Sequence, residues 1–368
     1  MTRRASSSPF APPLQQLNRT CVSYRGKELT YFGGCDYFRL SSHPEIISAF
    51  KEGLKRFGLN VAASRFTSGN HSLYHDLEKD LCRFFRVETA TLLSSGYVTN
   101  LALAQALAGD FSHALIDSRA HQSLRDCLPF LSCVVSEFRH RSASAVEAAI
   151  RGLNKNSRIL LLTDGLFSQD GSLAPLRDYL AVLPRTSKII VDDAHGAGTI
   201  GKNGRGTVEA LAVRSDQIIQ TISLSKAFGV YGGAILCDAN LRRKLLVSSP
   251  LLRGNTPLPL PLAHAGIRAL HLLSRDRTLR QRLQQNTEHV QARLREGAFS
   301  FPQPPTPLFS ITPSSKAAAR QLSARLMKEN IFPIQIQYGN SPSFFRFAIS
   351  SEHTSEQLAR LIRACQKV

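Results

Sequence analysis

VDDAHG at residues 191–196 and SLSKAFG at residues 223–229 are the two segments that decide the fold of this chain. Each follows a short apolar run with the composition of a strand buried in a parallel sheet. The carboxyl ends of parallel strands meet at one edge of a sheet, where open α/β folds bind their ligands. The pattern therefore predicts that Asp192, His195 and Lys226 lie together at that edge.

A lysine, a carboxylate and an imidazole in one site are what a pyridoxal phosphate enzyme needs. Lys226 would carry the cofactor as a Schiff base, and Asp192 would keep the pyridine nitrogen protonated so that the ring withdraws electrons. His195 would reach the phenolic oxygen of the ring. The other interpretation of these acids and this histidine is a metal site. No second cluster with ligand spacing accompanies them, so no metal is expected.

Two other turns and one strand add candidate site residues. Ser95, Gly96 and Tyr97 stand between a strand and a helix, where N–H groups and a hydroxyl could hold a phosphate. His121 follows another apolar run and could cover one face of the cofactor ring, although a histidine in a loop is often only a surface residue. Arg346 stands inside an apolar strand, so it needs a carboxylate from either the protein or an amino-acid substrate.

Strand-like and helix-like segments alternate through most of the chain, which predicts an α/β fold with a mostly parallel sheet. A Pro-rich run at residues 256–261 breaks this alternation. A long polar helix to about residue 296 and a small α+β domain are expected after it. The predicted division is an N-terminal arm at 1–40, a large cofactor-binding domain at 41–250 and a small C-terminal domain at 251–368.

The composition is that of a soluble globular protein, with 43% hydrophobic and 20% charged residues. No apolar stretch approaches the roughly 20 residues that a membrane helix needs, so no membrane partner is expected. The net charge is +19, and residues 241–368 hold 19 Lys and Arg against 6 Asp and Glu. This excess could attract coenzyme A, an acidic acyl carrier protein or nucleic acid, or it could be an ordinary basic surface.

The seven cysteines are scattered and odd in number, which predicts reduced thiols in a cytoplasmic protein. Residues 1–27 contain five basic residues and no acid. This segment fits either an organelle transit peptide or a short tail that leads into the arm.

Taken together, these segments resemble the α-oxoamine synthases. These are fold-type I pyridoxal phosphate enzymes that condense an amino acid with an acyl thioester and release CO₂. The resemblance runs from about residue 31 to the end of the chain, with the motifs in the family's order. It also rests on SRFTSGN at 64–70, FSQDG at 167–171 and GRG at 204–206. The first of these is most similar to the 8-amino-7-oxononanoate synthases of the biotin pathway, which use alanine and a pimeloyl thioester.

The resemblance implies a role for each residue of the site. Lys226 would form the Schiff base and remove the Cα proton, Asp192 would pair with the pyridine nitrogen, and His121 would stack on the ring and assist the oxyanion. His195 and Ser168 would approach the phenolic oxygen. The catalytic residues implied are thus Lys226, His121, Asp192 and His195. The cofactor-binding residues implied are Ser95, Gly96, Tyr97, His121, Ser168, Asp192, His195, Ser223, Lys226 and Thr256.

Substrate and subunit contacts are also implied by the resemblance. Arg346 would take the amino-acid carboxylate, and Cys35, Ser64 and Arg65 would lie in the substrate region. Cys35 stands where the family usually has asparagine. Thr256 would reach the phosphate bound in a neighbouring subunit, which implies a homodimer with a shared active site. The acyl donor would be an acyl-CoA or an acyl carrier protein.

Other functions remain open at this point. The nearest are a different α-oxoamine synthase, either of the 2-amino-3-ketobutyrate ligase type or with a long-chain acyl donor, and a fold-type I aminotransferase. A non-catalytic nucleic-acid-binding protein is a remote alternative that only the net charge of +19 suggests.

Overall fold

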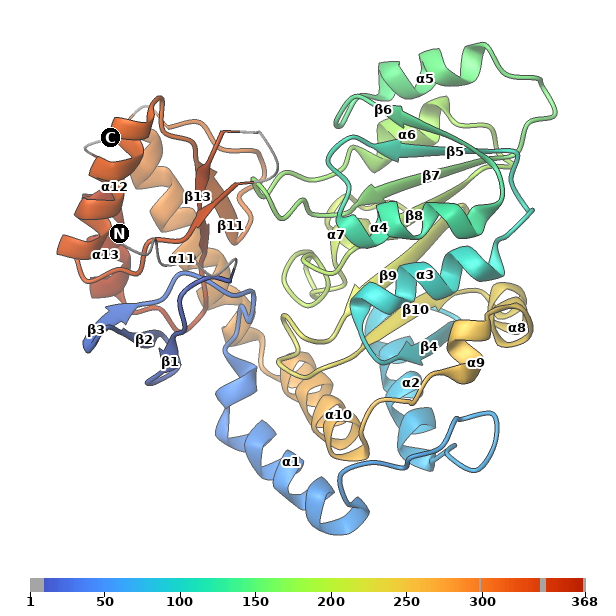
Figure 1. Cartoon of the computed structure of the whole chain (residues 1–368), viewed down its shortest axis with the longest axis horizontal. Coiled ribbons are helices and arrows are strands. Elements are labelled where there is room, and N and C mark those ends of the chain that lie inside the picture. The colour runs from blue at the N-terminus through green and yellow to red at the C-terminus, as the bar shows by residue number, and fades with distance from the viewer. Residues whose placement is uncertain (1–9, 298, 338–341, 367–368) are drawn as a thin grey trace, which may run out of the picture.

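A seven-stranded sheet forms the larger part of the structure, a computed structural model that describes residues 10–297, 299–337 and 342–366 (Figure 1). The strand order is β4-β10-β9-β8-β7-β5-β6. Only β10 runs against its two neighbours, so the predicted α/β fold with a mostly parallel sheet is confirmed. The strands are β4 (Thr89–Leu93), β5 (His113–Asp117), β6 (Val134–Phe138), β7 (Ile159–Asp164), β8 (Lys188–Asp192), β9 (Ile218–Ser223) and β10 (Gly233–Cys237).

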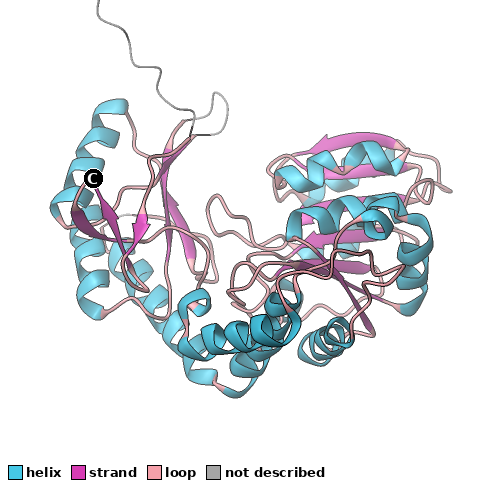
Figure 2. Ribbon diagram, turned by 60° about the horizontal axis from the view of Figure 1, so that its bottom comes forward, coloured by secondary structure: helices cyan, strands magenta, loops and turns pink. Residues whose placement is uncertain are grey.

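Helices cover both faces of this sheet (Figure 2). Alternate residues of the central strands point to opposite faces, so Leu160 and Leu162 enter one hydrophobic cluster and Leu161 enters another. Burial on both faces explains why these strands read as continuous apolar runs. The helices around the sheet are α2 (Ser72–Phe85), α3 (Gly96–Ala106), α4 (Gln122–Asp126), α5 (Ala143–Arg151), α6 (Leu176–Val182), α7 (Thr207–Ala210), α8 (Ala239–Ser248) and α9 (Pro250–Gly254).

A smaller antiparallel sheet, of order β11-β13-β12, forms the second part of the structure. The N-terminal sheet β1–β3 joins it: Phe332 N–H donates to the Thr30 carbonyl at 3.0 Å, and Ala348 N–H donates to the Phe32 carbonyl at 2.7 Å. The two ends of the chain thus share one structural unit (Figure 1). Its elements are β1 (Gln15–Gln16), β2 (Cys21–Tyr24), β3 (Lys27–Thr30), α11 (Arg277–Arg295), β11 (Leu308–Ile311), α12 (Lys316–Lys328), β12 (Gln335–Ile336), β13 (Phe344–Ala348) and α13 (Ser355–Cys365).

The long polar helix expected up to residue 296 is two helices, α10 (Leu260–Arg275) and α11. Asp276 separates them because its backbone is extended and its carboxylate accepts the N–H of Thr278 at 2.9 Å, which caps α11. Helix α10 is not polar throughout, since one face packs against α1 (Pro44–Phe57) and α2. The division of the chain at residues 40 and 250 stays a prediction.

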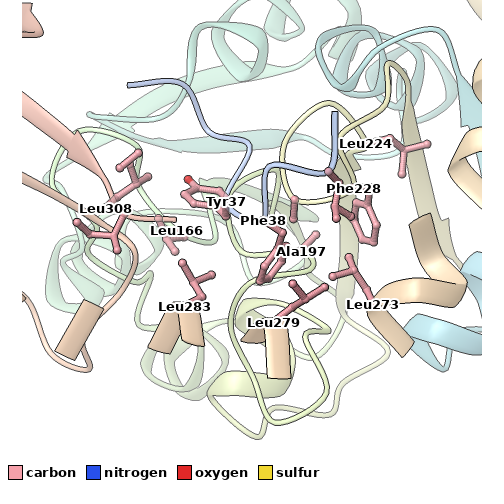
Figure 3. Close-up of a cluster of buried hydrophobic side chains, with 14 of the residues drawn as sticks. Tyr37, Phe38, Leu166, Ala197, Leu224, Phe228, Leu273, Leu279, Leu283 and Leu308 are labelled. Atoms are coloured by element: carbon pink, nitrogen blue, oxygen red, sulfur yellow. The ribbon is translucent and has the colours of Figure 1, made fainter. Parts of the chain in front are cut away.

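A hydrophobic cluster fills the space between the two parts of the structure (Figure 3). Tyr37 and Phe38, which follow the N-terminal sheet, belong to this cluster together with Leu166 of the large part and Leu283 of α11. Both aromatic side chains are fully buried. Aromatic burial of this size contributes about 1.5–3 kcal/mol per residue, so the segment after the N-terminal sheet fixes the two parts to each other.

No helix in the described part of the chain is both long and apolar enough to cross a membrane. The seven cysteines, all within the described residues, are free thiols.

His353 connects the small part of the structure to the segment after the N-terminal sheet. It is buried, its Nδ1 accepts the N–H of Ser350 at 2.9 Å, and its Nε2 lies 3.2 Å from the Tyr31 carbonyl. These partners require the neutral ring, with the proton on Nε2. Burial, followed by the charge of Arg39, lowers the pKa of His353 to about 3.

The substitution His353→Gln should lower the free energy of unfolding at pH 7 by about 1–3 kcal/mol, because buried hydrogen bonds are lost. Between pH 6.5 and pH 3, His353 is protonated in the unfolded chain but not in the folded protein. The free energy of unfolding of the wild type should therefore fall by roughly 2 kcal/mol between pH 7 and pH 5 through this residue. The difference in unfolding free energy between the wild type and the variant should narrow over the same range. Urea unfolding at both pH values checks this, with the exposed His289→Gln as control. A gap that does not change with pH would contradict it.

Candidate active site

A cavity of about 240 Å³ opens at the carboxyl ends of β4, β5, β8 and β9. The large sheet delivers several polar side chains here from segments far apart in the sequence, as expected for the strand ends of an open α/β sheet. Of the predicted site residues, the cavity brings together Ser95, Gly96, Tyr97, His121, Asp192, His195, Ser223 and Lys226. It is also lined by Ser123, Asp164, Ala194, Ser225 and Tyr231, which the sequence analysis did not select.

Asp192, the last residue of β8, is held in place by neutral donors. Its Oδ2 accepts from Asn100 Nδ2 at 2.7 Å, and its Oδ1 accepts from the Ala194 N–H at 3.1 Å. Thr221 Oγ1 donates to Asn100 Oδ1 at 2.8 Å, which turns the amide nitrogen of Asn100 toward the carboxylate. Asn100 is therefore a positioning residue. Sequence alone did not distinguish it from an ordinary polar residue near a helix start.

The neighbouring acid, Asp193, points away from the cavity, as strand alternation predicts. It is fully buried and accepts from Thr207 N, Thr207 Oγ1 and Gln220 Nε2, each at 2.7 Å. Burial raises its pKa to about 6, against the effect of these donors. Asp193 thus ties the loop after β8 to the start of α7 and to β9.

His195 is 7% exposed, and its Nδ1 lies 2.8 Å from the hydroxyl of Tyr37. Burial lowers its pKa well below the usual range, and the charges of Lys226 and Arg346 add to this effect. The imidazole is therefore neutral at physiological pH. The position of the His195 ring therefore depends on the segment after the N-terminal sheet, which supplies Tyr37.

His121 and Asp164 lie on the side of the cavity toward β5 and β7. The backbone N–H of His121 donates to Asp164 Oδ1 at 2.9 Å, and His121 Nδ1 lies 2.8 Å from Ser123 Oγ. The His121 ring is exposed, and partial desolvation lowers its pKa. Asp164 is buried, and burial together with the charge of Asp192 raises its pKa well above the usual range. The protonated form of Asp164 is thus favoured beside Asp192, which its place at the end of β7 did not indicate.

The first turn of α3 forms the wall between β4 and β9. Ser95 caps the helix, because its Oγ accepts the N–H of Val98 at 3.3 Å. A side chain at Gly96 would place its Cβ 2.8 Å from the Cβ of Ser223, so only glycine allows this approach. The hydroxyls of Ser223 and Ser225 lie 2.8 Å apart beside it. Helix N–H groups and hydroxyls together suit an anion.

A larger cavity of about 580 Å³ adjoins the first and shares His121 and Asp164 with it. Ser168 lines this second cavity, and not the first. Arg119 and Arg125 stand on its wall, which reaches the small sheet. This space was not expected from the sequence.

Arg346 and Cys35 approach the first cavity from the small part of the structure. Arg346 belongs to β13, and its charge helps to lower the pKa of His195. No acid within the described ranges forms an ion pair with it. The pKa of Tyr37 is raised well above its usual range by burial, and then by the charge and hydrogen bond of Cys35. Cys35 thus lies against the tyrosine that holds His195.

Three predicted residues lie away from both cavities of the single chain. Ser64 Oγ donates to the Arg253 carbonyl at 2.6 Å, and Arg65 forms an ion pair with Glu78 at 2.6 Å. Thr256 is exposed. The roles predicted for Ser64, Arg65 and Thr256 stay predictions.

Comparison with known proteins places this chain in a family. The family described as Aminotransferase class I and II matches residues 31–365. The chain is 30% identical to 8-amino-7-oxononanoate synthase of Thioalkalivibrio sulfidiphilus, over 93% of this chain and 88% of that protein. It is 32% identical to the enzyme of the same name from Methylococcus capsulatus, over 94% and 90% of the two chains.

Solved structures show the same fold. A serine palmitoyltransferase from S. paucimobilis superposes with a TM-score of 0.89 at 24% identity, covering 96% of this chain and 90% of that chain. An 8-amino-7-oxononanoate synthase from Francisella tularensis has a TM-score of 0.80 at 24% identity, covering 92% and 97%. These likenesses confirm the predicted architecture.

Asn100→Ala should lower the free energy of unfolding by about 2 kcal/mol, because Asp192 loses a donor and Thr221 loses its acceptor in a buried site. Urea unfolding of both proteins measures this difference. The control is Asn240→Ala at the exposed start of α8, which should change stability by less than about 0.5 kcal/mol. Equal stabilities of Asn100→Ala and the wild type would show that the hydrogen bonds around Asp192 contribute nothing.

Proposed function

Because the chain belongs to the aminotransferase class I and II family and, within it, to the α-oxoamine synthases, we propose that it joins alanine to a pimeloyl thioester with release of CO₂. This is the reaction of the 8-amino-7-oxononanoate synthases, to which its relatives belong. One observation carries the proposal: Lys226, Asp192, His121 and His195 line a single cavity. The cofactor of this protein is pyridoxal 5′-phosphate.

The residues of the cavity fit this cofactor. The first turn of α3 and the hydroxyls of Ser223 and Ser225 suit its phosphate. Asp192, which accepts hydrogen bonds from two fixed donors, suits a protonated pyridine nitrogen. Neutral His195 suits the phenolic oxygen. When bound, the cofactor supplies an electron sink that stabilises negative charge at the amino-acid Cα.

The side chains of this protein then orient the substrate and move its protons. Arg346, which has no acid partner in the described parts of the chain, would hold the amino-acid carboxylate as a guanidinium fork. Lys226 would take the proton from Cα, because its amine lines the cavity beside Asp192. His121 would donate a hydrogen bond to the oxygen of the thioester carbonyl as that oxygen gains charge.

The second cavity is where we place the acyl thioester. It meets the first cavity at His121, the residue that would act on the thioester carbonyl. Its volume of about 580 Å³ accommodates an acyl chain with part of its carrier, and Arg119 on its wall is 51% exposed. Arg119 pairs with Asp170 at 3.4 Å and Arg125 pairs with Glu137 at 2.8 Å, so a phosphate-bearing carrier, such as coenzyme A or an acyl carrier protein, would compete with these acids for the two guanidinium groups.

We further propose that the protein acts as a cytoplasmic homodimer. In a dimer, Thr256 would reach the phosphate bound in the neighbouring subunit, and Ser64 and Arg65 would lie in the substrate region. Thr256 is exposed, and the neighbouring Asn255 donates to Ser94 Oγ at 2.7 Å, close to the phosphate side of the cavity. The exposed Thr256 is accessible to a second subunit.

The purified protein loaded with pyridoxal phosphate should release thiol and CO₂ when given L-alanine and pimeloyl-CoA. Glycine, L-serine and palmitoyl-CoA should give rates at least about tenfold lower, because pocket contacts discriminate by that order. Lys226→Ala should lose the visible absorbance of the bound cofactor and at least about 10³-fold in turnover. Thiol release and labelled CO₂ measure both. Turnover of palmitoyl-CoA above that of pimeloyl-CoA would replace the proposed substrate, and full turnover by Lys226→Ala would refute the mechanism.

Arg119→Gln should raise the KM for the acyl thioester by about five- to tenfold and leave kcat within about twofold, because the arginine contacts the carrier and not the reacting atoms. Steady-state kinetics with pimeloyl-CoA at fixed alanine separate the two constants. Arg151→Gln on α5 removes the same charge at an exposed site outside the second cavity and serves as the control. Identical effects of the two substitutions would contradict the assignment of the second cavity.

A further inference from the structure

A basic cavity lies outside the site described above, between α2, the loop before α7, and the junction of α10 and α11. We call it the α10–α11 cavity. Its volume is about 260 Å³, and its wall carries four arginines and one histidine but only one acid. It concentrates part of the positive charge that the proposed reaction does not use. These charged residues are Arg83, Arg205, His271, Arg277, Arg280 and Asp80.

Nearby acids already neutralise one side of this cavity. Asp80 accepts from both Arg83 and His271 at 2.9 Å. Arg205 forms an ion pair with Glu209 at 3.1 Å. The charges of Glu209 and Asp276 also act on Arg280, but more weakly than its burial and the charge of Arg277.

Arg277 and Arg280 form no ion pair with any acid in the described ranges. Arg277 is exposed, whereas Arg280 is only partly exposed and donates to the Leu273 carbonyl at the end of α10. Burial, followed by the charge of Arg277, lowers the pKa of Arg280. The charged guanidinium is therefore destabilised at this place, and an anion between the two arginines would remove that cost.

We propose that the α10–α11 cavity binds a small phosphate-bearing anion, with Arg277 and Arg280 as its main ligands. Guanidinium groups match phosphate with two parallel hydrogen bonds, and a concave basic wall concentrates anions. The dimensions favour a small ligand over a nucleic acid, which needs an extended basic track. Pyrophosphate or the diphosphate of a nucleotide has the right charge and size.

The wall of this cavity is joined to the segment that carries Asp192. The Arg205 carbonyl accepts from Gln220 Nε2 at 3.2 Å, and the same nitrogen donates to Asp193 at 2.7 Å. The wall exists only in the folded protein, so an anion that binds it stabilises the folded state by mass action. Binding should raise the Tm of the holoenzyme.

The test is titration calorimetry of the holoenzyme, saturated with pyridoxal phosphate so that its own phosphate site is filled, with pyrophosphate at low salt. The wild type should bind one equivalent. Arg277→Gln should weaken Kd by at least about fivefold and Arg280→Gln by at least about tenfold, because each loses a charged phosphate contact. Arg320→Gln, at an exposed position on α12, should change Kd by less than about twofold.

ADP serves as a second probe in the same titration. Tighter binding of ADP assigns the site to a nucleotide, and equal binding assigns it to the diphosphate alone; either result supports the cavity. Because Arg277 is exposed, Arg277→Gln is expected to fold. This variant therefore tests the proposal even if Arg280→Gln does not fold. The proposal is overturned by no binding to the wild type, by unchanged Kd in Arg277→Gln, or by an equal loss in Arg320→Gln.

Discussion

The site depends on two adjacent carboxylates at the end of β8. Strand alternation sends Asp192 into the cavity and Asp193 into the loop behind it. A buried carboxylate costs several kcal/mol unless hydrogen-bond donors surround it, so each acid has its own set of donors. Asp192 accepts from Asn100, and Asp193 accepts from Thr207 and Gln220. The two sets together fix α3, β8, β9 and the loop before α7 as one frame.

The large sheet does not complete the site without the N-terminal segment. Tyr37 packs in the hydrophobic cluster between the two parts of the structure and also directs its hydroxyl at His195. The same side chain therefore contributes burial and orients a site residue. Because the N-terminal sheet hydrogen-bonds to the C-terminal part, the position of His195 depends on both ends of the chain.

The sequence predicted the residues that stand at strand ends, because an apolar run followed by Asp, His or Lys is a local pattern that the parallel sheet brings together. Other features depend on contacts between distant segments. The five residues of β10 are buried on both faces, so its composition does not reveal that it runs antiparallel. Asp276 is compatible with a helix interior, and only its bond to Thr278 makes it a cap. Asn100 acquires its role through Thr221 and Asp192, which lie more than ninety residues away.

Asp192 and Asp164 are two similar acids that line one cavity in different surroundings. Asp192 accepts from an amide and a backbone N–H and faces Lys226, a setting that suits a carboxylate. Asp164 accepts the His121 N–H, but burial and the charge of Asp192 raise its pKa, which favours its protonated form. In the proposed reaction, Asp192 would be the negative charge that a protonated ring meets, and a protonated Asp164 would lie between the two cavities without repelling a substrate carboxylate. Different surroundings can in this way give neighbouring acids different roles.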